Sequence, residues 1–217
     1  MILPEHEAKK VLSEAGIPVV PVATITSLQE AYSHAEAMQY PVALKISSSL
    51  YTHKSDVGAV LLNLQNREEL EEGFARLEKL QAELDPKAAI LLEPMVSPGV
   101  EFFIGVERRH DFGLVISFGL GGIWLELVQD VAFRLLPASR GDLKEMVNEL
   151  KSMKKLREGF RYFPPVPEDQ LLDLMSDISE FAIHHPELTE MDLNPVVIHL
   201  ERAVVVDARI VLADQDG

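Results

Sequence analysis

The chain has 217 residues, of which 47% are hydrophobic and 25% are charged, and this composition is typical of a folded globular protein. Its formal net charge of −15 repels polyanions, which argues against nucleic acid as a partner. Cysteine is absent, which excludes disulfides, a thiolate nucleophile and a cysteine-bound metal.

No apolar run approaches the ~20 residues that span a bilayer. The segment from Met1 to Glu7 has neither a basic leader nor an apolar signal core. We therefore expect a soluble protein of the cytoplasm with no membrane partner. The length fits one domain or two small lobes that share a cleft.

The first half of the chain is predicted to alternate helices and strands. Apolar residues at helical spacing predict helices over residues 5–15, 27–38 and 67–84. Strand composition predicts extended segments over residues 18–25, 42–46, 59–64 and 88–92. A polar loop over residues 47–57 lies between two of these strands.

The second half is richer in strands. Strand composition is found over residues 100–107, 113–119 and 131–136, and helices are predicted over residues 139–155 and 168–184. A hairpin closes the chain, with a charged turn at Glu201 and Arg202 and a returning strand over 203–211. A composition shift over residues 95–99 predicts two lobes, residues 1–95 and 96–217, in an α+β protein.

The terminal hairpin contains a candidate metal site. Antiparallel pairing brings Asn194 and Asp207 opposite one another, to within one or two residues of register. Magnesium favours one or two protein oxygens together with phosphate oxygens and water, which these side chains could provide beside a nucleotide. The alternative is ordinary turn chemistry, with Asp207 paired to Arg209 on the same strand face.

Two neighbouring segments carry candidate phosphate ligands. Lys45 interrupts an apolar strand, where an ammonium group needs a partner or an anionic ligand; the alternative is an edge-strand lysine that reaches solvent. His53 and Lys54 lie in the following polar loop. A neutral imidazole is nucleophilic, so His53 could accept or relay a phosphoryl group, although a lone loop histidine is usually solvated and inert.

The segment after the strand over 88–92 has the composition of a hinge. Backbone groups near Val96 could meet an adenine edge, and Glu93 or Glu101 could meet a ribose or amino group. The same Pro and Gly pattern would equally describe an ordinary surface connection.

Several segments form an ordered set of motifs over nearly the whole chain: Tyr-Pro-Val-Ala-Leu-Lys-Ile at 40–46, Thr-His-Lys-Ser-Asp-Val-Gly at 52–58, Glu-Pro-Met-Val at 93–96, Gly-Val-Glu-Phe-Phe-Ile-Gly at 99–105, Phe-Gly-Leu-Gly-Gly-Ile at 118–123, Asp-Val-Ala-Phe-Arg at 130–134, Met-Asp-Leu-Asn-Pro at 191–195 and Val-Asp-Ala-Arg-Ile at 206–210. Together they resemble the ATP-grasp subunit of the NDP-forming acyl-CoA synthetases. That group includes ADP-forming acetate-CoA ligase and is related to the succinyl-CoA synthetase beta subunit.

The resemblance implies an ATP-grasp fold in which two α+β lobes enclose a nucleotide cleft. It also implies roles for individual residues. The nucleotide contacts would be Lys45, Lys54, Glu93, Val96 and Glu101. The magnesium ligands would be Asn194 and Asp207. The residues that act in phosphoryl transfer would be His53, Asp192 near the partner's phosphohistidine, and Glu126 as a further candidate in the glycine-rich segment.

The implied reaction is acyl-CoA plus ADP plus phosphate giving carboxylate, CoA and ATP, reversibly. It implies ATP or ADP and magnesium as cofactors, and a CoA-binding alpha subunit that carries a phosphohistidine as partner in a hetero-oligomer. Two departures from the family pattern are Ala59, where a glycine is usual, and Gln129, where a lysine is common. The alternatives are a self-contained ATP-grasp carboxylate ligase and a nucleotide-binding module without turnover.

Overall fold

The computed structural model describes the chain except residues 51–56, 123–129, 162, 201 and 214–217. The chain divides into two compact units. The smaller unit consists of Pro4–Lys9 and Val20–Val96, and the larger of Met1–Leu3, Lys10–Val19 and Ser97–Gly217. The N-terminal segment therefore contributes to both units, and helix α1 (Glu5–Glu14) passes from one to the other. The division into lobes at residues 95 and 96 remains our proposal.

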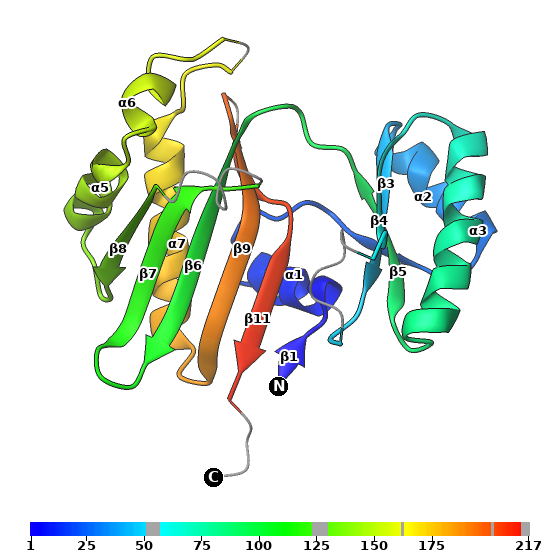
Figure 1. The fold of residues 1–217 in the computed structure, drawn as a ribbon, viewed down its shortest axis with the longest axis horizontal. Coiled ribbons are helices and arrows are strands. Elements are labelled where there is room, and N and C mark those ends of the chain that lie inside the picture. The colour runs from blue at the N-terminus through cyan, green and yellow to red at the C-terminus, as the bar shows by residue number, and fades with distance from the viewer. Residues whose placement is uncertain (51–56, 123–129, 162, 201, 214–217) are drawn as a thin grey trace. The chain divides into compact units, whose positions relative to one another are not determined.

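The smaller unit is built on a four-stranded antiparallel sheet with the order β2-β5-β3-β4. Helices α2 and α3 lie on the same side of this sheet (Figure 1). The elements are β2 (Ala23–Ile25), α2 (Leu28–Met38), β3 (Val42–Ser47), β4 (Val60–Leu64), α3 (Arg67–Leu84) and β5 (Ala89–Pro94).

Strand alternation decides what each face of β3 contacts. Val42, Leu44 and Ile46 belong to the apolar core that the sheet forms with α2 and α3. Side chains alternate along a strand, so Lys45 and Ser47 point to the opposite face. Every residue of β3 is nevertheless buried, which requires that the face bearing Lys45 be covered as well.

The larger unit contains a seven-stranded antiparallel sheet with the order β1-β11-β9-β6-β7-β8, and β10 pairs with β9. Helix α7 lies behind its central strands (Figure 1). The strands are β1 (Ile2–Leu3), β6 (Val100–Arg109), β7 (Gly113–Leu120), β8 (Val131–Leu135), β9 (Leu188–His199), β10 (Arg202–Val205) and β11 (Ala208–Leu212). The helices are α5 (Arg140–Glu149), α6 (Met153–Leu156) and α7 (Glu168–His184).

The helix expected over residues 139–155 is interrupted, and this prediction was wrong. Leu150 has an extended backbone that ends α5. The carboxylate of Asp130 accepts hydrogen bonds from the amides of Lys151 and Ser152, at 3.1 and 2.9 Å. These bonds satisfy amide groups at the beginning of α6, so the chain starts a new helix there.

The predicted returning strand over 203–211 is also divided, into β10 and β11, because Val206 and Asp207 lie between them. The α+β class is confirmed by the helices and the two separate antiparallel sheets. Among the described helices, none is both long and apolar enough to cross a membrane.

Candidate functional site

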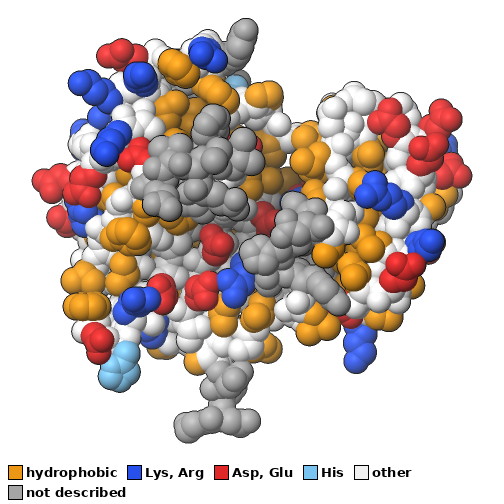
Figure 2. Space-filling model, viewed as in Figure 1, with side chains coloured by type: hydrophobic (Ala, Val, Ile, Leu, Met, Phe, Trp, Pro, Cys, Tyr) orange, Lys and Arg blue, Asp and Glu red, His pale blue; other side chains and the backbone are white. Residues whose placement is uncertain are grey.

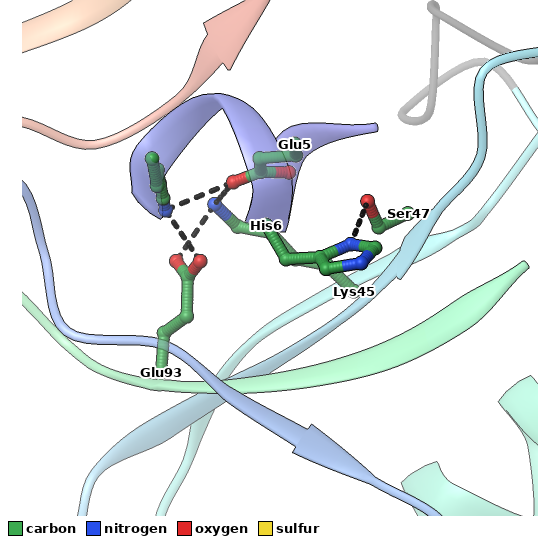
Figure 3. A network of polar contacts seen from close by, with 6 residues as sticks. Glu5, His6, Lys45, Ser47 and Glu93 are labelled. Carbon is green, nitrogen blue, oxygen red and sulfur yellow. Dashed lines mark hydrogen bonds and ion pairs between the residues drawn. The ribbon is translucent and has the colours of Figure 1, made fainter. Parts of the chain in front are cut away.

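Four buried charged side chains form one cluster in the smaller unit: Glu5, Lys9, Lys45 and Glu93, referred to below as the charge cluster. The Lys45 ammonium nitrogen lies 3.0 Å from Oε1 of Glu5 and 2.8 Å from Oε2 of Glu93. Lys9 lies 2.9 Å from the same oxygen of Glu5 and also contacts Oε1 of Glu93. Figure 3 shows the carboxylates of Glu5 and Glu93 converging with Lys45.

The topology explains why these groups meet. Lys45 and Glu93 come from adjacent strands, with Ala43 directly opposite Glu93 in the register of β3 and β5. Both therefore point to the face away from α2 and α3. Glu5 and Lys9 are spaced i, i+4 on α1, which places them on one side of that helix. The first turns of α1 thus cover the second face of β3.

The structure decides between the two interpretations of Lys45. Strand β3 lies between β5 and β4, and Lys45 is only 4% exposed. The interpretation of Lys45 as an edge-strand lysine that reaches solvent is therefore wrong, and the compensating partner expected for a buried ammonium group is present. Burial raises the pKa of Glu93, and the ammonium groups of Lys45 and Lys9 oppose that rise.

Val96 follows β5 at the end of the smaller unit and is half-buried. The amide of its neighbour Met95 donates to the carbonyl of Pro41, at 3.1 Å, which fixes this end of the strand against the segment before β3. Val96 therefore lies just beyond a fixed strand end, and it is not part of the charge cluster.

In the larger unit, a glycine turn joins two predicted site residues. The amide of Gly122 donates to Oδ1 of Asn194 at 3.0 Å, and the amide of Gly121 donates to the carbonyl of Glu101 at 2.9 Å. Gly122 has a φ of +57°, and a Cβ there would lie 2.2 Å from Oε2 of Glu101. Burial raises the pKa of the Glu101 carboxyl. A side chain at position 122 would therefore strain the backbone and displace the Glu101 carboxylate.

The predicted pairing of Asn194 and Asp207 is confirmed. The amide of Asn194 donates to the carbonyl of Asp207 at 3.2 Å, and the amide of Val206 donates to the carbonyl of Pro195 at 3.0 Å. Both side chains are half-buried. An amide oxygen and a carboxylate are ligand types that suit a hard divalent cation such as magnesium. Among the described residues, no group of three or more acidic or histidine side chains forms a metal cage.

Asp192 lies in a mixed group of charges on the sheet of the larger unit. It is directly opposite Arg209 of β11 and Gly105 of β6. Arg209 donates to Glu190 at 2.6 Å. Burial raises the pKa of Asp192; Arg209 lowers it, whereas Asp207 and Glu190 raise it further. Figure 2 shows acidic and basic side chains side by side over the central strands of this sheet.

Three predicted site residues, His53, Lys54 and Glu126, lie outside the described part of the chain. The structure therefore brings together Lys45 with Glu93 in one unit, and Asn194 with Asp207 and the Glu101 turn in the other.

Sequence reasoning missed Glu5 and Lys9. Their i, i+4 spacing on a predicted helix was visible, but such pairs usually lie on solvated faces. Only the position of α1 against β3 shows that this pair is buried. The role of Gly122 beside Glu101 was also missed, although the Gly-Gly pair marked a tight turn.

The fold agrees with comparisons to known proteins. Residues 1–212 match the model of the ATP-grasp domain. The chain is 39% identical over 214 residues to the beta subunit of acetate–CoA ligase [ADP-forming] II from Pyrococcus furiosus. This match covers 96% of this chain and 90% of that protein. The chain is 38% identical over 218 residues to acetate–CoA ligase [ADP-forming] II from Archaeoglobus fulgidus, but spans only 31% of that longer protein.

A solved structure is similarly close. The dinucleotide forming acetyl-coenzyme A synthetase 1 of Ca. Korarchaeum cryptofilum superimposes with a TM-score of 0.83 at 39% sequence identity, covering 97% of this chain and 92% of that one. It was solved in complex with coenzyme A and Mg-AMPPCP. The predicted ATP-grasp fold is thus confirmed. The chain belongs to the ATP-grasp family and, within it, to the group that contains the beta subunits of the ADP-forming acetate–CoA ligases.

Proposed function

We propose that the chain is the nucleotide-binding subunit of an ADP-forming acyl-CoA synthetase of the cytoplasm. It binds ATP or ADP with magnesium and transfers phosphate between the nucleotide and a phosphohistidine of a CoA-binding alpha subunit. The overall reaction converts acyl-CoA, ADP and phosphate into carboxylate, CoA and ATP, reversibly. The observation that carries the proposal is the backbone pairing of Asn194 with Asp207, which sets a residue with an amide oxygen opposite a residue with a carboxylate.

The relatives support this assignment. The matching Pyrococcus protein is a beta subunit, which implies an alpha partner for this chain too. The structure of the Korarchaeum synthetase is described with its phosphohistidine segment pointing towards the nucleotide binding site. This relative therefore supports a reaction in which a histidine of the partner subunit delivers phosphate to the nucleotide site of this chain.

In this proposal, two sets of residues hold the nucleotide. Lys45 and Lys54 contact the phosphates, and Glu93, Val96 and Glu101 contact the nucleoside. A magnesium ion held by Asn194 and Asp207 would neutralise phosphate charge. Phosphoryl transfer depends mainly on such positioning and charge neutralisation.

His53 is proposed as the group that receives phosphate. Its neutral ring nitrogen attacks the phosphorus of the partner's phosphohistidine, so a new nitrogen–phosphorus bond forms as the old one breaks. An oxygen of the ADP β-phosphate then attacks that phosphorus and releases the imidazole. Asp192 and Glu126 are assigned to the region where the partner's histidine is received.

The test uses the chain co-purified with its CoA-binding partner. After incubation with magnesium and γ-labelled ATP, acid-labile, base-stable phosphate is expected on both the partner and His53. In His53→Asn the label on this chain should disappear and synthetase activity should fall. Activity without any phosphohistidine would contradict the relay and favour a self-contained carboxylate ligase. Nucleotide binding with no turnover at all would favour a binding module.

A further inference from the structure

We propose that Glu5 and Lys9 are positioning residues of the nucleotide site, and that the first turns of α1 set the pose of Lys45 and Glu93 for their ligand. This inference rests on the proposed function, because it assumes that Lys45 and Glu93 face a nucleotide. It adds two residues, from an element that the motifs did not include, to the groups that determine nucleotide affinity.

The geometry of the charge cluster supports this positioning role. Each carboxylate lies between two ammonium groups and each ammonium group between two carboxylates. Glu93 uses Oε1 for Lys9 and Oε2 for Lys45, which fixes the plane of its carboxylate. An ammonium group has three donors, and two of those on Lys45 are directed at Glu5 and Glu93, which restricts the rotation of the group.

The cost of burying Glu5 and Lys9 also supports a positioning role. Lys45 and Glu93 already form a neutral pair, so Glu5 and Lys9 add two more buried charges without changing the net charge. Burying an ion network rarely stabilises a protein relative to apolar side chains of similar volume. The side chains of Glu5 and Lys9 are 1% and 0% exposed, so their desolvation is nearly complete. A contribution to stability therefore does not explain why Glu5 and Lys9 are buried beside Lys45 and Glu93. A role in fixing the positions of Lys45 and Glu93 does explain it.

A separate hydrogen bond also holds α1 on the same strand. The ring of His6 and the hydroxyl of Ser47 form a hydrogen bond of 3.1 Å between Nδ1 and Oγ. Ser47 is on the same face of β3 as Lys45, two residues further along. Figure 3 shows His6 extending from α1 toward Ser47 beside the charge cluster. The helix is therefore held on β3 at two successive positions of that face.

The test is a charge-balanced double variant, Glu5→Gln with Lys9→Met. It removes one charge of each sign and leaves Lys45 and Glu93 as a neutral pair, so the fold is expected to persist. The dissociation constant for Mg-ADP, measured by calorimetry on the complex with the CoA-binding partner, should rise about tenfold or more, the size of effect seen for directly coupled residues. The KM for CoA should stay unchanged.

A matched control comes from the same helix. Glu7→Gln with Lys10→Met changes the same residue types where they are exposed; Glu7 lies outside the cluster and the Lys10 side chain is 74% exposed. This control should bind Mg-ADP as the unaltered chain does. A second readout is the Lys45→Met background, in which Glu5→Gln should lower Mg-ADP affinity by a smaller factor than in the unaltered chain, because Lys45, one of its two direct partners, is already gone.

The possible outcomes separate the inference from the proposed function. A folded double variant with unchanged Mg-ADP affinity overturns the positioning role. If the double variant does not fold, Glu5→Asp provides the same test, because it keeps the charge but withdraws the carboxylate by one methylene. Unchanged affinity in Glu5→Asp likewise overturns the inference. Failure of the unaltered complex to bind Mg-ADP would instead refute the proposed function and, with it, this inference.

Discussion

Removal of the Lys9 charge tests the electrostatics of the charge cluster. Lys9 is fully buried and contacts both Glu5 and Glu93. Lys9→Met retains a long apolar side chain but leaves the two carboxylates with Lys45 as the one remaining ammonium group of the cluster. Breaking a buried ion pair from one side costs about 3–5 kcal/mol, because the other charge stays buried without compensation. For a chain of this size, the thermal midpoint should fall by roughly 6–20 °C.

The same variant predicts a dependence on pH. Burial raises the pKa of Glu93 in the folded chain, and the ammonium group of Lys9 is one of the two cations that oppose this rise. At a pH below about 4.3, the pKa of a glutamate in the unfolded chain, the carboxyl is protonated in both states and does not destabilise the fold. As the pH rises through the higher pKa of the folded state, the buried carboxyl ionises and the free energy of unfolding decreases. The loss in Lys9→Met should therefore be smaller near about pH 5 than near about pH 8.

The assay is thermal unfolding followed by circular dichroism at both pH values. Lys10→Met on the same helix serves as the control, because its exposed partner Glu14 is 4.0 Å away and such pairs contribute less than about 0.5 kcal/mol. If Lys9→Met unfolds at the temperature of Lys10→Met, or loses the same stability at both pH values, the assignment of alternating charges to the cluster is incorrect.

Three further predictions concern the larger unit. Asp207→Asn should weaken magnesium-dependent ADP binding, measured by calorimetry with and without a chelator, while leaving the unfolding midpoint unchanged; equal affinity for Mg-ADP would refute the metal role. Gly122→Ala and Gly113→Ala should each cost about 1–2 kcal/mol, since both residues have positive φ, but only Gly122→Ala, which displaces Glu101, should also weaken nucleotide binding. Asp130→Ala should destabilise the chain by about 1–3 kcal/mol through two lost amide partners, with Mg-ADP affinity retained; normal stability would show that the α5–α6 break does not depend on this carboxylate.

Local patterns were sufficient to predict much of the fold. The start of α2 was visible in the sequence because Ser27 and Glu30 are capping residues, and the Ser27 hydroxyl does accept from the Glu30 amide, at 3.3 Å. The pairing of Asn194 with Asp207 followed from counting outward from a short turn, since the register of a hairpin is set locally. These features depend only on residues close in sequence.

Features that depend on distant residues could not be predicted. The break between α5 and α6 is made by Asp130, about twenty residues earlier, whose carboxylate accepts from the amides of Lys151 and Ser152 directly before α6. The partner of Lys45 was anticipated as a type of group, because a buried ammonium group must be compensated. Its identity as Glu5, forty residues away, follows only from the packing of α1 on β3.

The neutrality of the charge cluster bears on how a chain with a net charge of −15 could hold a polyanionic ligand. Two ammonium groups and two carboxylates cancel, so Lys45 cannot attract phosphate through the net charge of its surroundings. In the proposed function, its contribution would come from the fixed direction of its donors, an effect that acts at hydrogen-bond distance and is little screened by salt when the group is buried. Long-range attraction would then be left to the proposed ligands Lys54 and a cation at Asn194 and Asp207. Raising the ionic strength should therefore reduce nucleotide affinity by the same factor in the charge-balanced variant Glu5→Gln with Lys9→Met and in the unaltered chain, because the cluster is neutral in both.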